Sequence, residues 1–263
     1  MTHTTTIGDQ LRTWRQRRRM SQLDLALEAE ISTRHLSFVE TGRAAPSRDM
    51  VLRLAERLDV PLREQNLMLV AAGFAPVFPE RRLDDPAMQP VRIAIDQILA
   101  GHEPFPALAV DRHWTLVSAN RAVMRLLTGV DASLLAPPVN VLRLSLHPLG
   151  LAPRIVNLPE WREHLFARLR RQIDLSADPT IIALLDELRA YPAPNGLPWR
   201  RPHPAPELAP VIPFQLATEA GVLSFVSTTM VFGTPVDITL AELAVESFFP
   251  ADGATAELLR TAM

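Results

Sequence analysis

Residues 32–43, STRHLSFVETGR, combine polar, basic and aromatic side chains in a pattern that could read nucleic-acid bases. Leu36 and Val39 are three residues apart, so in a helix they share one face, which would be buried. The other face then carries hydroxyl groups, a guanidinium and an aromatic ring, supplied by Thr33, Arg34, Ser37 and Phe38. A guanidinium can donate two hydrogen bonds to guanine O6 and N7, and an aromatic ring can contact thymine methyl groups. The pattern predicts an amphipathic helix whose outer side suits the major groove of DNA.

Neighbouring polar residues could hold the DNA backbone on either side of this helix. Ser21 and Gln22 open the preceding helix, where free backbone N–H groups and a side-chain amide can bind a phosphate. Arg43 and Arg48 flank the loop after the helix and suit phosphate contacts as well. Arg34 itself could contact either a base or a phosphate, and the sequence leaves both roles open.

These side chains need a compact helical scaffold, and residues 1–75 predict one. Apolar periodicity, serines at N-cap positions and a proline at a first helical position indicate five short helices. They cover about residues 7–18, 22–28, 32–40, 48–60 and 61–73. The second and third form a helix-turn-helix, in which the second helix lies in the major groove of DNA. A helical module that contacts another protein is the alternative.

Residues 21–60 resemble the DNA-binding domain of the XRE family, which is related to the lambda and 434 repressors. The resemblance rests on the SQ pair at 21–22, the capped recognition helix, ExG at 40–42 and the proline after the following turn. It extends over about residues 7–73 without gaps. It implies double-stranded DNA as a partner.

Two further features follow from this resemblance. Many family members have glycine in the turn between the two helices, whereas this chain has Glu30 there. The resemblance also implies an internal ion pair between the first helix and the end of the recognition helix. In this sequence the pair would be Arg15 with Glu40, and we give it a structural role rather than a DNA contact.

Composition sets limits on the class of protein. The chain has 263 residues, 48% of them hydrophobic, a formal net charge of −2 and no cysteine, which excludes disulfides, thiol catalysis and cysteine-ligated zinc. The N-terminus lacks an apolar signal core, and the longest nearly apolar run, residues 67–78, is shorter than the roughly 20 residues that span a bilayer. We therefore expect a cytoplasmic, nucleoid-associated protein without a membrane partner.

The remainder predicts a second domain of the α+β class. We place a linker at 76–88, because this stretch is rich in proline and charge, and the second domain at 89–263. Alternating or apolar runs predict four strands of an antiparallel sheet, at about 105–111, 114–120, 211–218 and 222–232. The register of residues 236–249 allows either a helix or a strand, and we favour a fifth strand. Residues 140–190 look mostly helical, and the proline-rich stretch 193–210 is predicted to be a loop.

The strand–strand–helix order around Asn120 is similar to the opening of a PAS domain, and the whole resembles the MmyB-like branch of XRE regulators. The resemblance implies a small hydrophobic ligand, for which a fatty acid or acyl chain is our preferred candidate. The apolar wall would include Phe105, Leu116, Leu126, Phe166, Phe214 and Phe225. A carboxylate head could bind to Arg143, His147, Arg154 or His164. Ordinary core packing and surface ion pairs are the alternative roles for these residues.

No motif indicates an enzyme, a metal site or a resident cofactor. The sequence lacks G-x-S-x-G, H-E-x-x-H, a phosphate-binding G-x-x-x-x-G-K loop and a Rossmann glycine pattern. The hypothesis from the sequence is a one-component transcription regulator, acting as a homodimer on a pseudo-palindromic operator. The alternative is a ligand-independent DNA-binding dimer or an antitoxin-like interaction protein.

Overall fold

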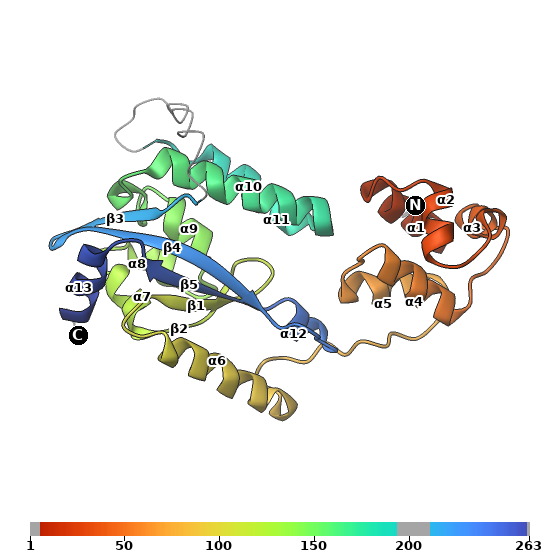
Figure 1. Cartoon of the computed structure of the whole chain (residues 1–263), viewed down its shortest axis with the longest axis horizontal. Coiled ribbons are helices and arrows are strands. Elements are labelled where there is room, and N and C mark those ends of the chain that lie inside the picture. The colour runs from red at the N-terminus through yellow and green to blue at the C-terminus, as the bar shows by residue number, and fades with distance from the viewer. Residues whose placement is uncertain (1–5, 194–210, 262–263) are drawn as a thin grey trace. The chain divides into compact units, whose positions relative to one another are not determined.

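The computed structural model describes residues 6–193 and 211–261, and it divides into two compact units (Figure 1). The helical unit comprises the described chain up to Arg81 together with Pro235–Ala241. The sheet unit comprises the described remainder. Nearly all of the predicted loop 193–210 lies outside the described residues. No helix in the described ranges is long and apolar enough to cross a membrane.

The helical unit contains the five predicted helices around one core. They are α1 (Ile7–Arg17), α2 (Gln22–Glu28), α3 (Thr33–Glu40), α4 (Arg48–Arg57) and α5 (Leu62–Ala71). Each of the first four begins after a hydroxyl residue whose side chain accepts a hydrogen bond from a backbone N–H of the first turn: Thr6, Ser21, Ser32 and Ser47. These caps satisfy donors that a helix leaves unpaired, so each short helix has a defined start.

Two backbone positions, Glu30 and Gly8, determine how α3 packs against α2 and α1. Glu30, in the turn between α2 and α3, has φ of 56°, in the left-handed region that favours glycine. Gly8 in α1 lies against the end of α3, where an added Cβ would be 2.7 Å from the carbonyl oxygens of both Val39 and Glu40. A larger residue at position 8 would push α1 away from α3.

The sheet unit is built on a five-stranded antiparallel sheet, which confirms the predicted fold class. Its strands are β1 (Ala107–Val110), β2 (Leu116–Ala119), β3 (Phe214–Thr218), β4 (Gly221–Val231) and β5 (Ala244–Pro250). Their order across the sheet is β2-β1-β5-β4-β3. All four neighbouring pairs run antiparallel. The first and last strands of the unit therefore meet in the centre, where β1 pairs with β5.

Helices cover both faces of this sheet (Figure 1). Leu108 and Val110 of β1 face the larger core, to which α10 (Leu158–Ser176) and α11 (Pro179–Ala190) contribute. Ala107 and Ala109 face a smaller core shared with α6 (Gln89–Gly101). Because both faces are covered, β1 is buried at every residue. The helices are η1 (Pro86–Met88), α6 (Gln89–Gly101), α7 (Arg121–Leu126), α8 (Ala132–Leu135), α9 (Val141–Leu146), η2 (Ala152–Arg154), α10 (Leu158–Ser176), α11 (Pro179–Ala190) and α13 (Gly253–Thr261).

The fifth strand begins later than the sequence predicted. The sequence of residues 236–249 allowed a helix or a strand and we favoured one strand, but the segment contains both, because α12 (Ile238–Ala241) precedes β5. Asp237 causes the difference, because its side chain accepts a hydrogen bond from the backbone N–H of Thr239 and starts a helical turn. This segment belongs to the helical unit, where Ile238 N donates to Pro79 O at 2.8 Å and Arg81 pairs with Asp237 at 2.9 Å.

Glu30→Gly should stabilise the helical unit by about 1 kcal/mol, because glycine removes the steric cost of the left-handed conformation. Chemical denaturation followed by circular dichroism measures the change. Glu28→Gly is the matched control, since Glu28, the last residue of α2, has no positive φ and glycine there should destabilise rather than stabilise. Equal or lower stability of Glu30→Gly would contradict the assigned strain.

Candidate functional site: a DNA-reading helix and an apolar cavity

Helix α3 is fixed within the helical unit through one face and both ends. Leu36 and Val39 are buried in the core. The Ser32 hydroxyl accepts a hydrogen bond from His35 N at 3.1 Å and so caps the start of the helix. Gly42, with φ of 72°, lies just beyond the end, where the left-handed conformation carries no Cβ penalty. The remaining side chains of α3 thus project from a rigid support.

Arg34, Phe38 and Arg43 form one group on the outer side of α3. The guanidinium carbon of Arg34 lies 5.3 Å from the centre of the Phe38 ring, and that of Arg43 lies 6.0 Å from the same ring. Both arginines are exposed, while Phe38, Thr33 and Ser37 are half-buried. A cation over an aromatic face at an exposed site gains about 0.5–1 kcal/mol. Phe38 therefore lies close to two guanidinium groups on the surface that the sequence predicts to face DNA.

A buried ion pair joins α1 to the last residue of α3. Nε and Nη2 of Arg15 donate to Oε1 and Oε2 of Glu40 at 2.7 and 2.9 Å, and the two residues are 9% and 2% exposed. Burial alone would raise the pKa of Glu40, but hydrogen bonds from Arg15 and Gln22 and the charges of Arg15 and Arg12 outweigh it. The pKa of Glu40 therefore lies below its usual value, and the carboxylate stays charged inside the fold.

The residues predicted to contact phosphates are distributed around this pair and the loop after α3. The amide nitrogen of Gln22 donates to Glu40 Oε2 at 2.8 Å, so this amide is used inside the helical unit. Ser21 caps α2. Arg43 follows α3 and Arg48 is the first residue of α4, and both are exposed. The two arginines are accessible to a phosphate backbone, whereas the Gln22 side chain also positions Glu40.

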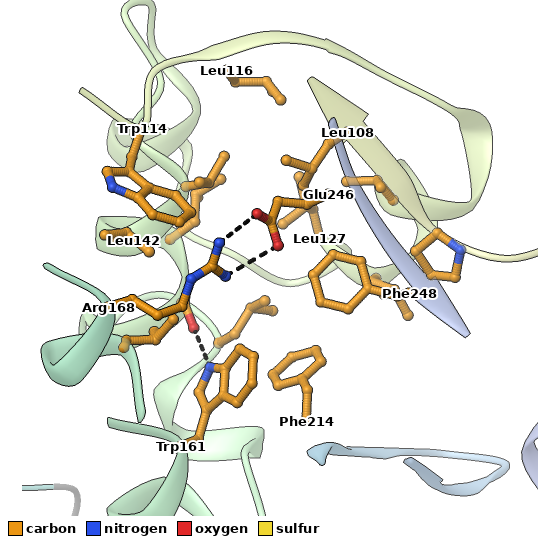
Figure 2. A pocket seen from close by; sticks show the side chains of 18 residues that line it. Leu108, Trp114, Leu116, Leu127, Leu142, Trp161, Arg168, Phe214, Glu246 and Phe248 are labelled. Atoms are coloured by element: carbon orange, nitrogen blue, oxygen red, sulfur yellow. Dashed lines mark hydrogen bonds and ion pairs between the residues drawn. The ribbon is translucent and has the colours of Figure 1, made fainter. Parts of the chain in front are cut away.

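The sheet unit encloses an apolar cavity of about 90 Å³, shown in Figure 2. Its wall comes from β1, β2, β3 and β5 on the sheet side and from α7, α9 and α10 on the helical side. The lining residues are Pro106, Leu108, Trp114, Leu116, Val123, Leu126, Leu127, Val141, Leu142, Leu144, Ser145, Leu151, Trp161, Leu165, Arg168, Phe214, Glu246 and Phe248. A predominantly apolar wall with a few polar groups is typical of small-molecule sites.

The polar part of the wall is an ion pair between α10 and β5. Arg168 donates to both carboxylate oxygens of Glu246, at 3.1 and 2.6 Å. Figure 2 shows the pair across the cavity from Phe214, with the Trp114 ring beside the guanidinium. Nearby, Trp161 Nε1 donates to Ser145 Oγ at 3.0 Å. The cavity therefore combines an apolar interior with an internally neutralised pair.

The residues that the sequence proposed for the apolar wall divide into two groups. Leu116, Leu126 and Phe214 line the cavity. Phe166 and Phe225 are buried in the surrounding core but do not line it. Phe105 lies in the turn before β1, where its ring meets His102 edge-on.

The four candidates for a carboxylate anchor lie outside the cavity lining, and the structure gives each of them a partner. Arg143 forms a two-pronged pair with Glu187, at 2.8 and 2.7 Å. Arg154 donates to three backbone carbonyl oxygens. The ring of His147 meets that of Tyr191 edge-on. His164 stacks on the Trp161 ring, and burial, followed by the charges of Arg168 and Arg171, lowers its pKa.

Sequence reasoning missed the ion pair in the cavity. Arg168 and Glu246 are 78 residues apart, on a helix and a strand, so no local spacing connects them. A signal was present in β5, because Glu246 interrupts the apolar run AVESFF at a position that the sheet must bury. A lone acid within a buried strand indicates a partner elsewhere, since a buried charge is paired.

A second, more open hollow of about 780 Å³ lies in the same unit. It is lined by α7, the β3–β4 turn and α13, and includes Leu126, Ala220, Leu223 and Leu258. Arg154 is among the lining residues, with its guanidinium bound to backbone carbonyls.

Within the described ranges no group of three histidine, aspartate or glutamate side chains could hold a metal ion.

Comparisons with known proteins identify two matching regions. A family model described as the MmyB-like transcription regulator ligand binding domain matches residues 91–262, and one described as a helix-turn-helix matches residues 11–65. No curated protein matches the chain. A solved structure of an RNA-binding Light-Oxygen-Voltage receptor is 13% identical to this chain and has a TM-score of 0.26. The match covers 98% of this chain and 64% of the receptor chain.

Arg15→Met should destabilise the helical unit by about 3–5 kcal/mol at neutral pH, because it leaves the Glu40 carboxylate buried without its main partner. In the wild type the pKa of Glu40 is depressed by folding, so its stabilisation is present above the unfolded carboxyl pKa and is lost as pH falls through the folded value. In Arg15→Met burial instead raises that pKa, so the difference between the two proteins should shrink in acid. Urea denaturation at a series of pH values measures it.

Arg12→Met is the matched control for this pair. Arg12 is also near Glu40, at 3.7 Å, but its side chain is 41% exposed. We expect a loss below about 1 kcal/mol, the usual range for exposed pairs. Equal losses in the two variants, or a pH-independent loss in Arg15→Met, would argue against a buried charge pair.

Proposed function

Because the chain belongs to the family defined by the MmyB-like transcription regulator ligand binding domain, we propose that it is a one-component sensor, active at DNA in the cytoplasm. It is a DNA-binding transcription regulator with a ligand-binding domain. In the proposal, α3 reads an operator and the cavity of the sheet unit binds a small hydrophobic ligand. The observation that carries the DNA-reading part is the Arg34–Phe38–Arg43 cluster on the outer side of a helix that is capped and anchored in the core.

The proposed operator contact uses the outer face of α3. Arg34 is exposed near the start of the helix, where recognition helices contact base edges. Thr33 and Ser37 supply hydroxyl groups, and Phe38 supplies an apolar surface for a thymine methyl group. Arg43 and Arg48 are proposed phosphate contacts. We propose a homodimer on a pseudo-palindromic operator, with two α3 helices about 34 Å apart.

The proposed ligand is a compound with an acyl or similar apolar chain, a fatty acid among the candidates. The apolar lining of the cavity supports this class. Its volume of about 90 Å³ is below the roughly 300–1,000 Å³ of pockets for drug-sized ligands. A short chain fits, whereas a longer one requires α7, α9 and α10 to move apart. Such movement would change DNA affinity only if the ligand prefers one conformation of the protein over another.

A ligand-independent DNA-binding dimer, or an antitoxin-like interaction protein, is the second candidate function. The small volume of the cavity favours it, because a tightly packed PAS-like domain can serve for assembly alone. Native mass spectrometry of the purified protein and a thermal-shift screen with saturated acyl compounds separate the two functions. Retained ligand mass or a concentration-dependent rise in melting temperature supports sensing. The absence of both effects supports the second candidate.

Arg34→Ala should weaken operator binding by about 1–3 kcal/mol and relax the preference at one base position, because a two-pronged contact to guanine is lost. Footprinting identifies the operator, and mobility shifts on operators with single-base changes measure the preference. Arg57→Ala is the control, because Arg57 is an exposed arginine at the end of α4, outside the helix-turn-helix, and should leave affinity unchanged. A uniform loss on all DNA sequences in Arg34→Ala would instead assign Arg34 to a phosphate.

Val141→Phe should abolish the thermal shift produced by acyl compounds, because the larger ring occupies the cavity at the start of α9. The full-length variant should keep its far-ultraviolet circular dichroism and its operator binding. Ala220→Phe is the matched control, since it adds the same ring to the open hollow and should leave the shift intact. The reverse pattern would place the ligand in the open hollow.

A further inference from the structure

We propose that the cavity selects a ligand with an uncharged polar head, such as an amide or an alcohol, and rejects a carboxylate. This inference rests on the proposed ligand-sensing function and narrows its ligand class: among compounds with an apolar chain it favours amides and alcohols over the ionised fatty acid. Its basis is that Arg168, the only basic residue among the described lining residues, is already neutralised by an acid on the same wall.

The pair between Arg168 and Glu246 is closed by a third side chain. Nη1 of Arg168 donates to Oε2 of Glu246, and Nη2 donates to Oε1. Thr229 Oγ1 accepts a hydrogen bond from Nη2 at 3.0 Å and donates to Oε1 at 2.7 Å. Each member of this triangle therefore bonds to the other two, and the positive and negative charges lie in direct contact.

The triangle is held in place from both sides. The side chains of Arg168 and Glu246 are 18% and 4% exposed, so neither ion is well hydrated. The guanidinium carbon lies 4.7 Å from the centre of the Trp114 ring, which also lines the cavity (Figure 2). Rotation of Arg168 towards a ligand would break two charge-assisted hydrogen bonds and leave Glu246 buried without its cation.

This arrangement disfavours an anionic head on physical grounds. A carboxylate that entered the cavity would place two negative charges against one guanidinium, within an apolar wall. It would lose its own hydration and gain no unpaired cation in return. A neutral amide or hydroxyl loses far less hydration, so the same apolar chain should bind more tightly when it carries such a head.

Two groups can serve an uncharged head. Glu246 lines the cavity, and its Oε2 accepts a hydrogen bond from Arg168 Nη1 at 3.1 Å; a carboxylate oxygen can accept a second one, from an amide N–H or an alcohol O–H. Ser145 Oγ accepts from Trp161 Nε1, so its own O–H can donate to a ligand carbonyl or hydroxyl oxygen. A head that both donates and accepts matches these groups, whereas a carboxylate can only accept.

Isothermal titration of the full-length protein with hexanamide, hexan-1-ol and hexanoate at neutral pH tests the inference. These probes share a six-carbon chain that suits a small cavity and differ in the head. We expect hexanamide and hexanol to bind the wild type at least about tenfold more tightly than hexanoate, because the carboxylate of hexanoate would be buried without a free cation to pair with. Glu246→Gln should reverse the order, since it leaves Arg168 with an uncompensated charge that hexanoate can neutralise.

Glu187→Gln is the matched control, because it removes the acid of another two-pronged arginine pair, with Arg143, outside the cavity lining. It should keep the wild-type order. Hexanoate binding to the wild type as tightly as hexanamide would overturn the inference and leave the sensing function standing. Failure of all three probes would also overturn it, and the sensing function falls with it only if the longer acyl compounds fail as well. If Glu246→Gln does not fold, the wild-type order decides.

Discussion

The cost of burying a carboxylate organises both units of this protein. An ionised acid that is removed from water is tolerated only when a cation and further hydrogen bonds replace its hydration. Each unit meets this requirement in the same way, with an arginine that donates to both oxygens of one glutamate. Arg15–Glu40 joins two helices, and Arg168–Glu246 joins a helix to the central region of a sheet. A third polar side chain completes each pair: Gln22 in the first and Thr229 in the second.

In the helical unit this requirement fixes the end of α3, whose outer face is the proposed DNA-reading surface. Glu40 is the last residue of α3, so its ion pair with Arg15 attaches the C-terminal end of α3 to α1. Gly8 allows α1 to approach the same end closely. The start of α3 is fixed by the Ser32 cap and by the left-handed turn at Glu30. With both ends held, the outer side chains can vary to suit an operator without a change in the scaffold.

Local chemistry made the helical unit predictable from the sequence, and non-local pairing made the cavity unpredictable. The N-caps, the helical periodicity and the five strands each depend on neighbouring residues. The segment before β5 was ambiguous between helix and strand, and the favoured strand starts later than predicted because Asp237 caps a helical turn there. Aromatic residues such as Phe166 have the composition of a pocket wall, but only the packing of α10 determines that they fill the core instead. The Arg168–Glu246 pair can be predicted only when it is known that α10 packs over β5, and the spacing of residues in the sequence does not give this packing.

The path of the chain constrains how a ligand could affect DNA binding. After β4 the chain contributes Pro235–Ala241 to the helical unit and then returns to form β5. The two units are therefore joined at three points in the sequence rather than one, and β5 carries Glu246 a few residues beyond the last of them. A ligand that binds beside Glu246 acts on a strand that continues directly into a segment bonded to Pro79 and Arg81. Coupling between ligand and DNA binding further requires that the ligand bind one of two conformations of the chain more tightly than the other.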